Sequence, residues 1–226
     1  MGHGASPAGW GSEMRQVVRS TIDHPFFARI WPVVAAHEAP AVGAMRRENL
    51  AGLSGRVLEI GAGTGTNFAD YPPSVEQVIA LEPEPRLVTH ARAAAAAAPV
   101  PVVVVGQTAE AFSDAEPFDM VVCSLVLCSV RDPAGVLQRI YSSLRPGGEL
   151  RFLEHVASAG ARGRLQRVAD ATLWPRLFGN CHTHRDTERA IVDAGFEVDA
   201  SRRAWTLPLW APLPVSELAL GRARRP

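Results

Sequence analysis

The sequence predicts an α/β domain with a doubly wound, mostly parallel sheet. Two observations predict this fold. Short apolar segments alternate with helical segments, and the first apolar segment runs into a turn with glycine at alternate positions. Such alternation is typical of parallel strands joined by crossover helices. A length of 226 residues suits one such domain with a lid. Seven strands are expected, the last of them antiparallel.

The expected strands are rich in Val, Ile and Leu, as in strands buried on both faces. Five parallel strands are expected near residues 56–60, 77–81, 101–105, 118–123 and 148–155, followed by an antiparallel pair at 196–204 and 215–223. Helices are expected near 86–98, 133–144, 162–178 and 186–193. Asp132 is the expected N-cap of the second helix, with Pro133 at its first position.

The N-terminal segment has a different composition. Residues 1–12 are rich in Gly, Ser, Ala and Pro and are predicted to be a disordered tail. Residues 13–49 show a helical pattern that is expected to break at Pro25, Pro32 and Pro40. Their apolar side chains have no place in the sheet, so we predict a helical lid over its ligand-binding edge. The remaining residues, 50–226, would then form the α/β domain that binds the ligand.

Composition limits the classes of partner. Lys and Arg total 23, as do Asp and Glu, so net charge offers no argument for nucleic acid. Three cysteines at unrelated spacings indicate no disulfide framework and suit a reducing compartment. No signal pattern and no apolar run of about 18 residues is present. We expect a cytoplasmic protein without membrane insertion that acts on a small molecule; the oligomeric state stays open.

The glycine turn is the strongest functional signal. It reads Glu59-Ile60-Gly61-Ala62-Gly63-Thr64-Gly65 after a buried strand. Glycines at these positions let the backbone turn sharply and approach a ligand closely. The spacing differs from G-x-G-x-x-G, which places a pyrophosphate at a helix N-terminus. It favours S-adenosylmethionine, whose tail and ribose need no phosphate cradle; a nicotinamide cofactor and a purely structural turn are the alternatives.

A second acid lies where the glycine turn predicts it. Glu82 ends the second expected strand, about 20 residues beyond the turn, where a carboxylate accepts hydrogen bonds from ribose hydroxyls. The same charge would repel a 2′-phosphate, which argues against NADP. A surface glutamate that opens a turn before Pro83 is the alternative.

These motifs together resemble the class I S-adenosylmethionine-dependent methyltransferases, whose fold is a Rossmann-like sheet of seven strands. The matching residues are the turn at 57–65, Glu82-Pro83, Phe118-Asp119, the stretch at 144–148 and Ala194-Gly195-Phe196.

A narrower resemblance is to the methyltransferase-like family whose animal members methylate alkyl thiols. It rests on Thr66-Asn67-Phe68 with Tyr71-Pro72-Pro73, the stretch at 121–130, Glu154-His155-Val156, and Gly179-Asn180-Cys181 ahead of Arg185-Asp186-Thr187. Unlike those animal members, this chain is expected to have no hydrophobic N-terminal anchor. The resemblance implies methyl transfer to a small, fairly apolar acceptor, most simply a thiol. Methylation of oxygen or nitrogen, for example on a phenol, and a catalytically silent binding module are alternatives.

The resemblance also implies cofactor contacts. Glu59, Gly61 and Gly63 would contact the methionine end, and Glu82 would hold the ribose. Pro83, Thr108 and Ala109 would lie near the adenine, and Ser124 and Leu125 would face the sulfonium. Gly65 and Asn67 belong to the same turn. The family usually carries an acid near the adenine, where this chain has Gln107-Thr108.

Candidate catalytic residues are histidines. His155 ends the fifth expected strand, at the edge where open α/β sheets bind ligands, and is predicted to act as a base or to orient the acceptor. A histidine that only satisfies a backbone carbonyl is the alternative. His184 is the second candidate, in a loop with His182 and Cys181. Without a distant set of partners, this loop predicts no metal site.

The acceptor pocket is predicted to contain aromatic and soft side chains. They are Phe27, Trp31, Cys128, Trp174 and His182. Core packing is the alternative for each aromatic residue, and a solvated loop position is the alternative for His182.

Overall fold

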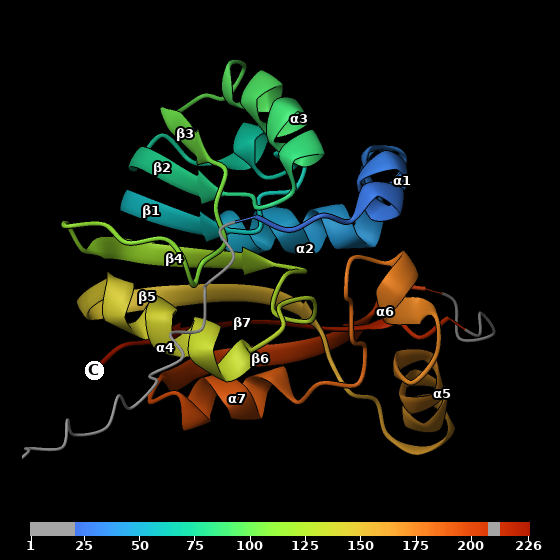
Figure 1. The fold of residues 1–226 in the computed structure, drawn as a ribbon. Coiled ribbons are helices and arrows are strands. Elements are labelled where there is room, and N and C mark those ends of the chain that lie inside the picture. Colours follow the sequence, from blue (N-terminus) through green and yellow to red (C-terminus); the bar gives the residue numbers. More distant parts are fainter. Residues whose placement is uncertain (1–20, 208–212) are drawn as a thin grey trace, which may run out of the picture.

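The computed structural model describes residues 21–207 and 213–226. It contains one seven-stranded sheet with helices on both faces (Figure 1). The strand β7 runs antiparallel to both of its neighbours, and the other pairings are parallel, which confirms the predicted fold class. In sheet order the strands are β3 (Val102–Val105), β2 (Val75–Leu81), β1 (Gly55–Ile60), β4 (Phe118–Ser124), β5 (Leu144–His155), β7 (Glu217–Arg224) and β6 (Glu197–Trp205).

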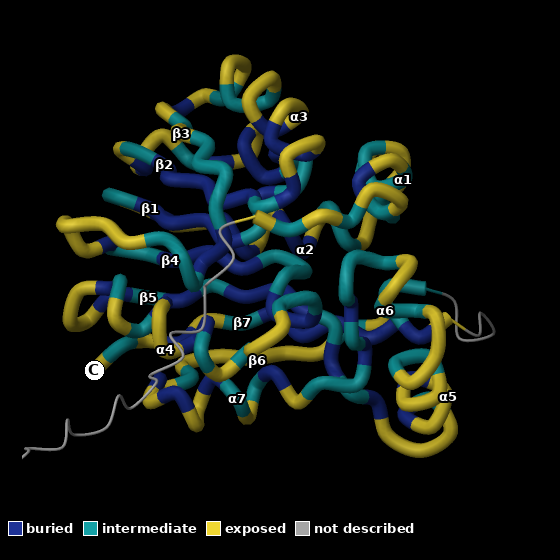
Figure 2. Tube along the Cα trace, in the orientation of Figure 1, coloured by how far each residue is buried: buried dark blue, intermediate teal, exposed yellow. Residues whose placement is uncertain are grey.

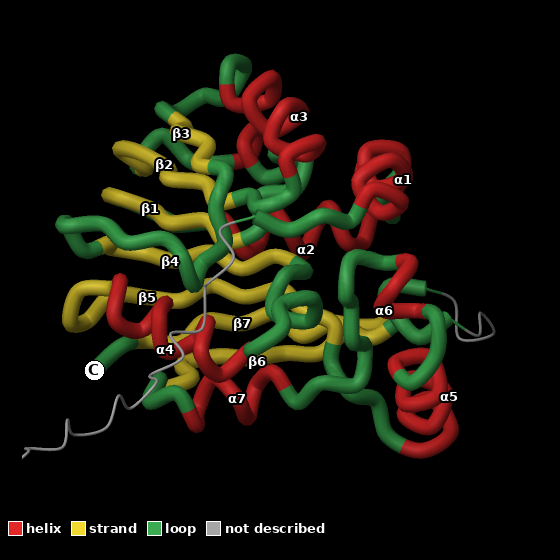
Figure 3. Tube along the Cα trace, in the orientation of Figure 1, coloured by secondary structure: helices red, strands yellow, loops and turns green. Residues whose placement is uncertain are grey.

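The α-helices, like the strands, range from 4 to 12 residues in length. They are α1 (Pro25–Ala36), α2 (Pro40–Leu50), α3 (Pro85–Ala95), α4 (Pro133–Ser143), α5 (Gly160–Asp170), α6 (Trp174–Leu177) and α7 (Thr187–Asp193), with a 3-10 turn η1 at Phe68–Asp70. Asp132 caps α4 as predicted, because its side chain accepts from the backbone N–H of Gly135. Figure 3 shows helices gathered around the strands and at the end toward which the parallel strands point.

The core has two layers because successive strand side chains face opposite sides of the sheet. Along β1, Leu58 and Ile60 belong to the larger cluster, which includes Leu137 of α4. Val57 belongs to the second cluster with Ala91 of α3. The central strands β1, β2 and β4 are accordingly largely buried, whereas the edge strand β6 and the outer helix faces are exposed (Figure 2).

One predicted helix, at 162–178, is wrong in its continuity. The structure has two helices there, α5 and α6, separated by a turn. Asp170 ends α5, and its carboxylate accepts from the backbone N–H groups of Thr183 (2.7 Å) and His184 (2.9 Å). Pro175 then lies in the first turn of α6, where its missing N–H costs nothing. Tertiary ties therefore break a pattern that is locally continuous.

The N-terminal segment forms α1 and α2. Pro25 and Pro40 begin these helices, whereas Pro32 lies inside α1, so the break predicted there is wrong. The helix continues past Pro32 with the loss of one backbone hydrogen bond. The disordered tail predicted at 1–12 lies outside the described residues. Within the described ranges, every helix is too short or too polar to cross a bilayer.

Candidate active site

A small cavity lies at the carboxyl ends of β1 and β4. Figure 1 shows that the arrows of the parallel strands point toward this side, where α1, α2 and α6 gather. The cavity is lined by Trp31, Arg46, Glu59, Gly61, Ala62, Gly63, Thr66, Asn67 and Ser124. Of the predicted cofactor residues, the structure therefore brings together Glu59, Gly61, Gly63, Asn67 and Ser124.

The three glycines of the turn have different reasons for being glycine. All have positive φ, with 68° at Gly61, 59° at Gly63 and 80° at Gly65. A Cβ at Gly61 would lie 2.4 Å from a methyl group of Val126, and one at Gly65 would lie 2.7 Å from the Phe68 ring. Gly61 and Gly65 are therefore required by packing. At Gly63 an added Cβ would instead meet a side chain of the N-terminal helices.

That side chain is Trp31 of α1. A Cβ on Gly63 would lie 2.9 Å from the indole Nε1. The Trp31 ring also stacks on Phe27, with 5.1 Å between ring centroids. Phe27 in turn covers Gly179, where an added Cβ would lie 3.0 Å from the Phe27 ring. The two aromatic residues thus bridge the glycine turn and the loop that follows α6.

Glu59 is the centre of a buried polar network. Its carboxylate accepts from Asn67 Nδ2 (2.8 Å) and from the Tyr71 hydroxyl (2.7 Å). Asn67 Oδ1 accepts from Arg46 (3.1 Å), which also pairs with Glu38 (2.6 Å). Burial raises the pKa of Glu59 to about 7 despite these donors. Sequence reasoning missed Arg46, since nothing in a helical N-terminal segment marks one arginine as buried.

Glu82 ties the second strand to the glycine turn. Its carboxylate accepts from the backbone N–H groups of Gly63 (2.7 Å) and Glu84 (2.8 Å). Burial raises its pKa to about 7. A carboxylate has about four lone-pair sites, so two stay available to other donors. The neighbouring Pro83 accepts from the backbone N–H of Ile22 (3.0 Å), which fastens the segment before α1 at this point.

The remaining predicted cofactor residues lie at the ends of β3 and β4. Thr108 and Ala109 are both buried after β3 but are not among the residues that line the cavity. Ser124 Oγ accepts from Asn67 Nδ2 (3.3 Å). Leu125 follows with φ of 60°, a left-handed conformation that costs a non-glycine residue about 1–3 kcal/mol and is typical of functional sites.

Glu154 shapes the loop after β4 and was not predicted as a site residue. It is fully buried, and its carboxylate accepts from the backbone N–H groups of Val126 (3.0 Å), Leu127 (2.9 Å) and Cys128 (3.2 Å). Burial raises its pKa from the ordinary value for a glutamate. The signals in the sequence are an acid inside an apolar strand and its place in the Glu154-His155-Val156 stretch that carries the family resemblance.

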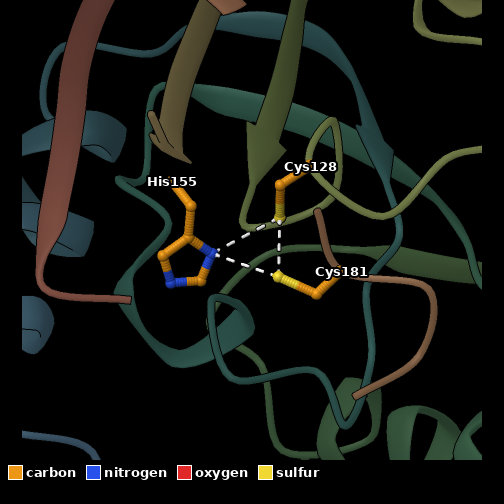
Figure 4. Close-up of side chains that lie close together, drawn as sticks. All are labelled: Cys128, His155 and Cys181. Atoms are coloured by element: carbon orange, nitrogen blue, oxygen red, sulfur yellow. Dashed lines mark hydrogen bonds between the residues drawn. The ribbon is translucent and has the colours of Figure 1, made fainter. Parts of the chain in front are cut away.

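The two predicted bases each use a ring nitrogen within the protein. His155 Nδ1 lies 3.4 Å from Cys128 Sγ and 3.7 Å from Cys181 Sγ (Figure 4). His184 Nε2 lies 3.1 Å from the guanidinium of Arg167, which can only donate, so that nitrogen accepts. Both catalytic roles stay predictions.

The other predicted acceptor residues divide into two groups. His182 donates its backbone N–H to the carbonyl of Cys128 (2.8 Å), and burial lowers the pKa of its ring. Trp174 instead stacks on Phe178, with centroids 4.1 Å apart. Its Nε1 is buried without a hydrogen-bond partner among the described residues. Of the predicted acceptor residues, Trp31 lines the cavity and Phe27 stacks on it, whereas Cys128, Trp174 and His182 are not among the lining residues.

The glycine turn, the acid at the end of β2 and this sheet order define a nucleoside-binding domain of the methyltransferase type. Residues 35–201 match a family described as a methyltransferase domain, and the chain belongs to that family. The family assignment confirms the predicted class of enzyme, a methyltransferase that uses S-adenosylmethionine.

Similar proteins of known name include thiol S-methyltransferases. The chain is 37% identical to the rat thiol S-methyltransferase TMT1B over 186 residues, 78% of this chain and 74% of that protein. It is 35% identical to human TMT1A over 158 residues, 66% and 64% of the two chains. Among solved structures, the N-methyltransferase NodS from Bradyrhizobium japonicum in complex with S-adenosyl-L-homocysteine has a TM-score of 0.66 at 18% identity, covering 90% of this chain and all of that one.

Proposed function

We propose that this enzyme methylates the sulfur of a small, fairly apolar thiol. The observation that carries the proposal is the similarity to thiol S-methyltransferases across 78% of the chain. Two stacked aromatic side chains support it, because Trp31 lines the cavity beside the glycine turn and Phe27 packs on Trp31. Apolar and aromatic walls of this kind suit an apolar acceptor.

The residues present fit the cofactor. Gly63 provides close backbone approach, and Glu82 has lone pairs left for ribose hydroxyls. Buried Asn49 has a side-chain oxygen without a partner among the described residues, beside Ser124, and suits the ammonium group of the methionine tail. Arg46, which lines the cavity, would neutralise the tail carboxylate. S-adenosylmethionine supplies an electrophilic methyl group on a sulfonium.

The N-terminal helices act as the lid of this site. Trp31 lies directly over Gly63, one of the two glycines of the turn that line the cavity. The Trp31 side chain must therefore shift when a cofactor approaches the turn. Closing α1 over both ligands would exclude water and hold the acceptor in line, which is the main contribution a protein can make to a displacement at carbon. The segment at 13–20 of the predicted lid lies outside the described residues.

The acceptor proton needs little help from the enzyme. A free thiol has a pKa of about 8.5, so a few per cent is thiolate near neutrality. This fits the observation that the two candidate bases, His155 and His184, already use a ring nitrogen inside the protein. We infer that substrate ionisation and alignment, with no obligatory general base, produce turnover. The rate should then rise with pH up to the pKa of the bound thiol.

A paired acceptor panel tests the proposal. Methyl-labelled S-adenosylmethionine is incubated with alkyl and aryl thiols and with the alcohol or phenol of the same carbon skeleton. We expect labelled thioethers from the thiols and little product from their oxygen analogues. His155→Ala should preserve more activity at pH 9 than at pH 7 if the histidine assists ionisation. If the thiols are inert while a phenol or an amine is methylated, the thiol assignment is wrong and only the family assignment holds.

One alternative acceptor has a specific observation behind it. The chain is 35% identical to a ubiquinone biosynthesis O-methyltransferase from Xanthomonas over 133 residues, 58% of this chain and 55% of that protein. A phenol, with a pKa of about 10, would depend more on a base. The paired panel distinguishes it from a thiol. The proposed location is the cytoplasm, supported by three cysteines that are all free.

A further inference from the structure

Three ligand-type side chains from separate parts of the chain meet at one edge of the sheet. Cys128 lies in the loop after β4, His155 ends β5, and Cys181 lies in the loop between α6 and α7. Figure 4 shows the two sulfurs and the imidazole Nδ1 pointing toward one another. The three atoms lie within 4.8 Å of one another, and both sulfurs are buried.

The distances in this cluster match the edges of a tetrahedral zinc shell. With Zn–S of about 2.3 Å and Zn–N of about 2.0–2.1 Å, a tetrahedron has S–S edges of about 3.8 Å and S–N edges of about 3.6 Å. The two sulfurs, of Cys128 and Cys181, are 3.8 Å apart. The two sulfur–nitrogen distances, to His155 Nδ1, are 3.4 Å and 3.7 Å.

The backbone holds these side chains in place without help from an ion. The N–H of His182 donates to the carbonyl of Cys128 (2.8 Å), which joins the two cysteine loops. The amide of Asn180 donates to the carbonyl of Ser129 (2.7 Å). Asn180 has φ of 66°, a left-handed conformation that Asn adopts more readily than most residues, and this fixes the turn that presents Cys181. Glu154 fixes the Cys128 loop from below through three backbone N–H groups.

We propose that Cys128, His155 and Cys181 form a binding site for a zinc-type divalent cation. Two cysteines and one histidine are a known zinc ligand set in which the fourth position is left for water or substrate. On binding, each thiol releases one proton to solvent and each sulfur donates an electron pair to the ion. Two thiolates cancel the +2 charge, so the complex is neutral and suits a buried position. In this role His155 is a ligand and not a general base.

The sequence alone could not group these ligands. In the sequence, the neighbours of Cys181 are His182 and His184, and these three residues do not make a complete set of metal ligands. In the structure His184 contacts Arg167, and His182 approaches the cluster through its backbone only. The partners of Cys181 are instead Cys128, in the loop after β4, and His155, at the end of β5.

Metal stoichiometry and spectroscopy on the wild-type full chain test the site. The protein is reduced, stripped with a chelator, loaded with zinc and desalted. We expect one retained zinc per chain by elemental mass spectrometry. Cobalt loading should give the visible bands of a tetrahedral ion together with sulfur-to-cobalt charge transfer in the near ultraviolet. Failure to retain zinc, an octahedral cobalt spectrum, or a Cys128–Cys181 disulfide in the protein as isolated would each overturn the proposal.

Variants identify the ligands. Cys128→Ala, Cys181→Ala and His155→Ala should each weaken zinc binding by more than about 100-fold in a competition titration, because loss of a ligand should exceed the 10- to 100-fold cost of losing an outer-shell partner. Cys123→Ala, a buried cysteine outside the cluster, and His90→Ala, an exposed histidine on α3, are matched controls. Unchanged affinity in the three ligand variants would overturn the assignment. If a variant does not fold, the wild-type cobalt spectrum still decides.

Discussion

Replacing Glu82 by glutamine should separate the contribution of its charge from that of its shape. The carboxylate now accepts from the backbone N–H groups of Gly63 and Glu84. A glutamine keeps one acceptor oxygen and presents an NH2 group where the second acceptor stood. One of the two backbone donors would then lack its partner, and the ribose would lose a charged acceptor. The variant therefore affects both the turn and the ligand.

The magnitude follows from the number of hydrogen bonds lost. A hydrogen bond to a charged group contributes about 1.5–3 kcal/mol, which corresponds to about 10- to 150-fold in affinity. Calorimetric titration with S-adenosyl-L-homocysteine at pH 8 should therefore show Glu82→Gln binding about 10- to 150-fold more weakly than wild type. Glu76→Gln, on the exposed side of the same strand, should bind like wild type.

The pH dependence of binding gives a second, independent readout. Burial raises the pKa of both Glu59 and Glu82 to about 7, and the ionised forms are the ones that accept from ligand donors. Below pH 7 the affinity should fall by up to tenfold per pH unit for each group, hence about 100-fold per unit for both. Glu82→Gln should reduce that slope to about tenfold. An unchanged affinity together with an unchanged slope would refute the ribose role of Glu82.

Three further predictions concern the same site. In the ligand-free protein, the native state holds protons on Glu59 and Glu82 that the unfolded chain has already released. The free energy of unfolding should therefore fall as pH rises from about 4.5 to about 7. A rise in that window, measured by urea denaturation, would contradict the assigned burial. Trp31→Ala should raise the KM of the acceptor by up to about tenfold, because about 0.5–1.5 kcal/mol of aromatic packing is lost, and it should not weaken cofactor affinity. A weaker cofactor affinity with an unchanged acceptor KM in steady-state kinetics would argue against the lid. Glu154→Gln should cost about 1–3 kcal/mol of stability, because one oxygen cannot serve three backbone donors, and an unchanged denaturation midpoint would show that the loop does not depend on them.

The sheet could be predicted from the sequence because its signals are local. Most strands are apolar runs of their own, and the alternation of strands with helices predicts a mostly parallel sheet. The glycine turn and Glu82 could be placed for the same reason, since both lie at strand ends, whose position in an open parallel sheet is fixed by the fold. Glu82 duly meets Gly63 across 19 residues of sequence.

The errors arose where tertiary contacts override local patterns. The arginine-rich stretch at 162–178 has helical periodicity throughout, yet Asp170 accepts from residues 13 and 14 positions later and the helix ends there. The burial of Arg46 could not be predicted, because it depends on Asn67 and Glu38, neither of which lies within one helical turn of it. Patterns of hydrophobicity report on faces of elements, and they carry no information on which charged side chain has a buried partner.

Part of the cysteine–histidine cluster could be predicted from the order of the strands. Cys128 and His155 follow or end two adjacent parallel strands, since β4 pairs with β5, so strand order alone brings them to one edge of the sheet. Cys181 is different, because its loop could leave α6 in many directions. Its path is set by the backbone bond from His182 to Cys128 and by Asp170, which accepts from Thr183 and His184. The topology of the sheet is thus enough to bring Cys128 and His155 together, whereas the position of Cys181 depends on contacts that only the folded chain makes.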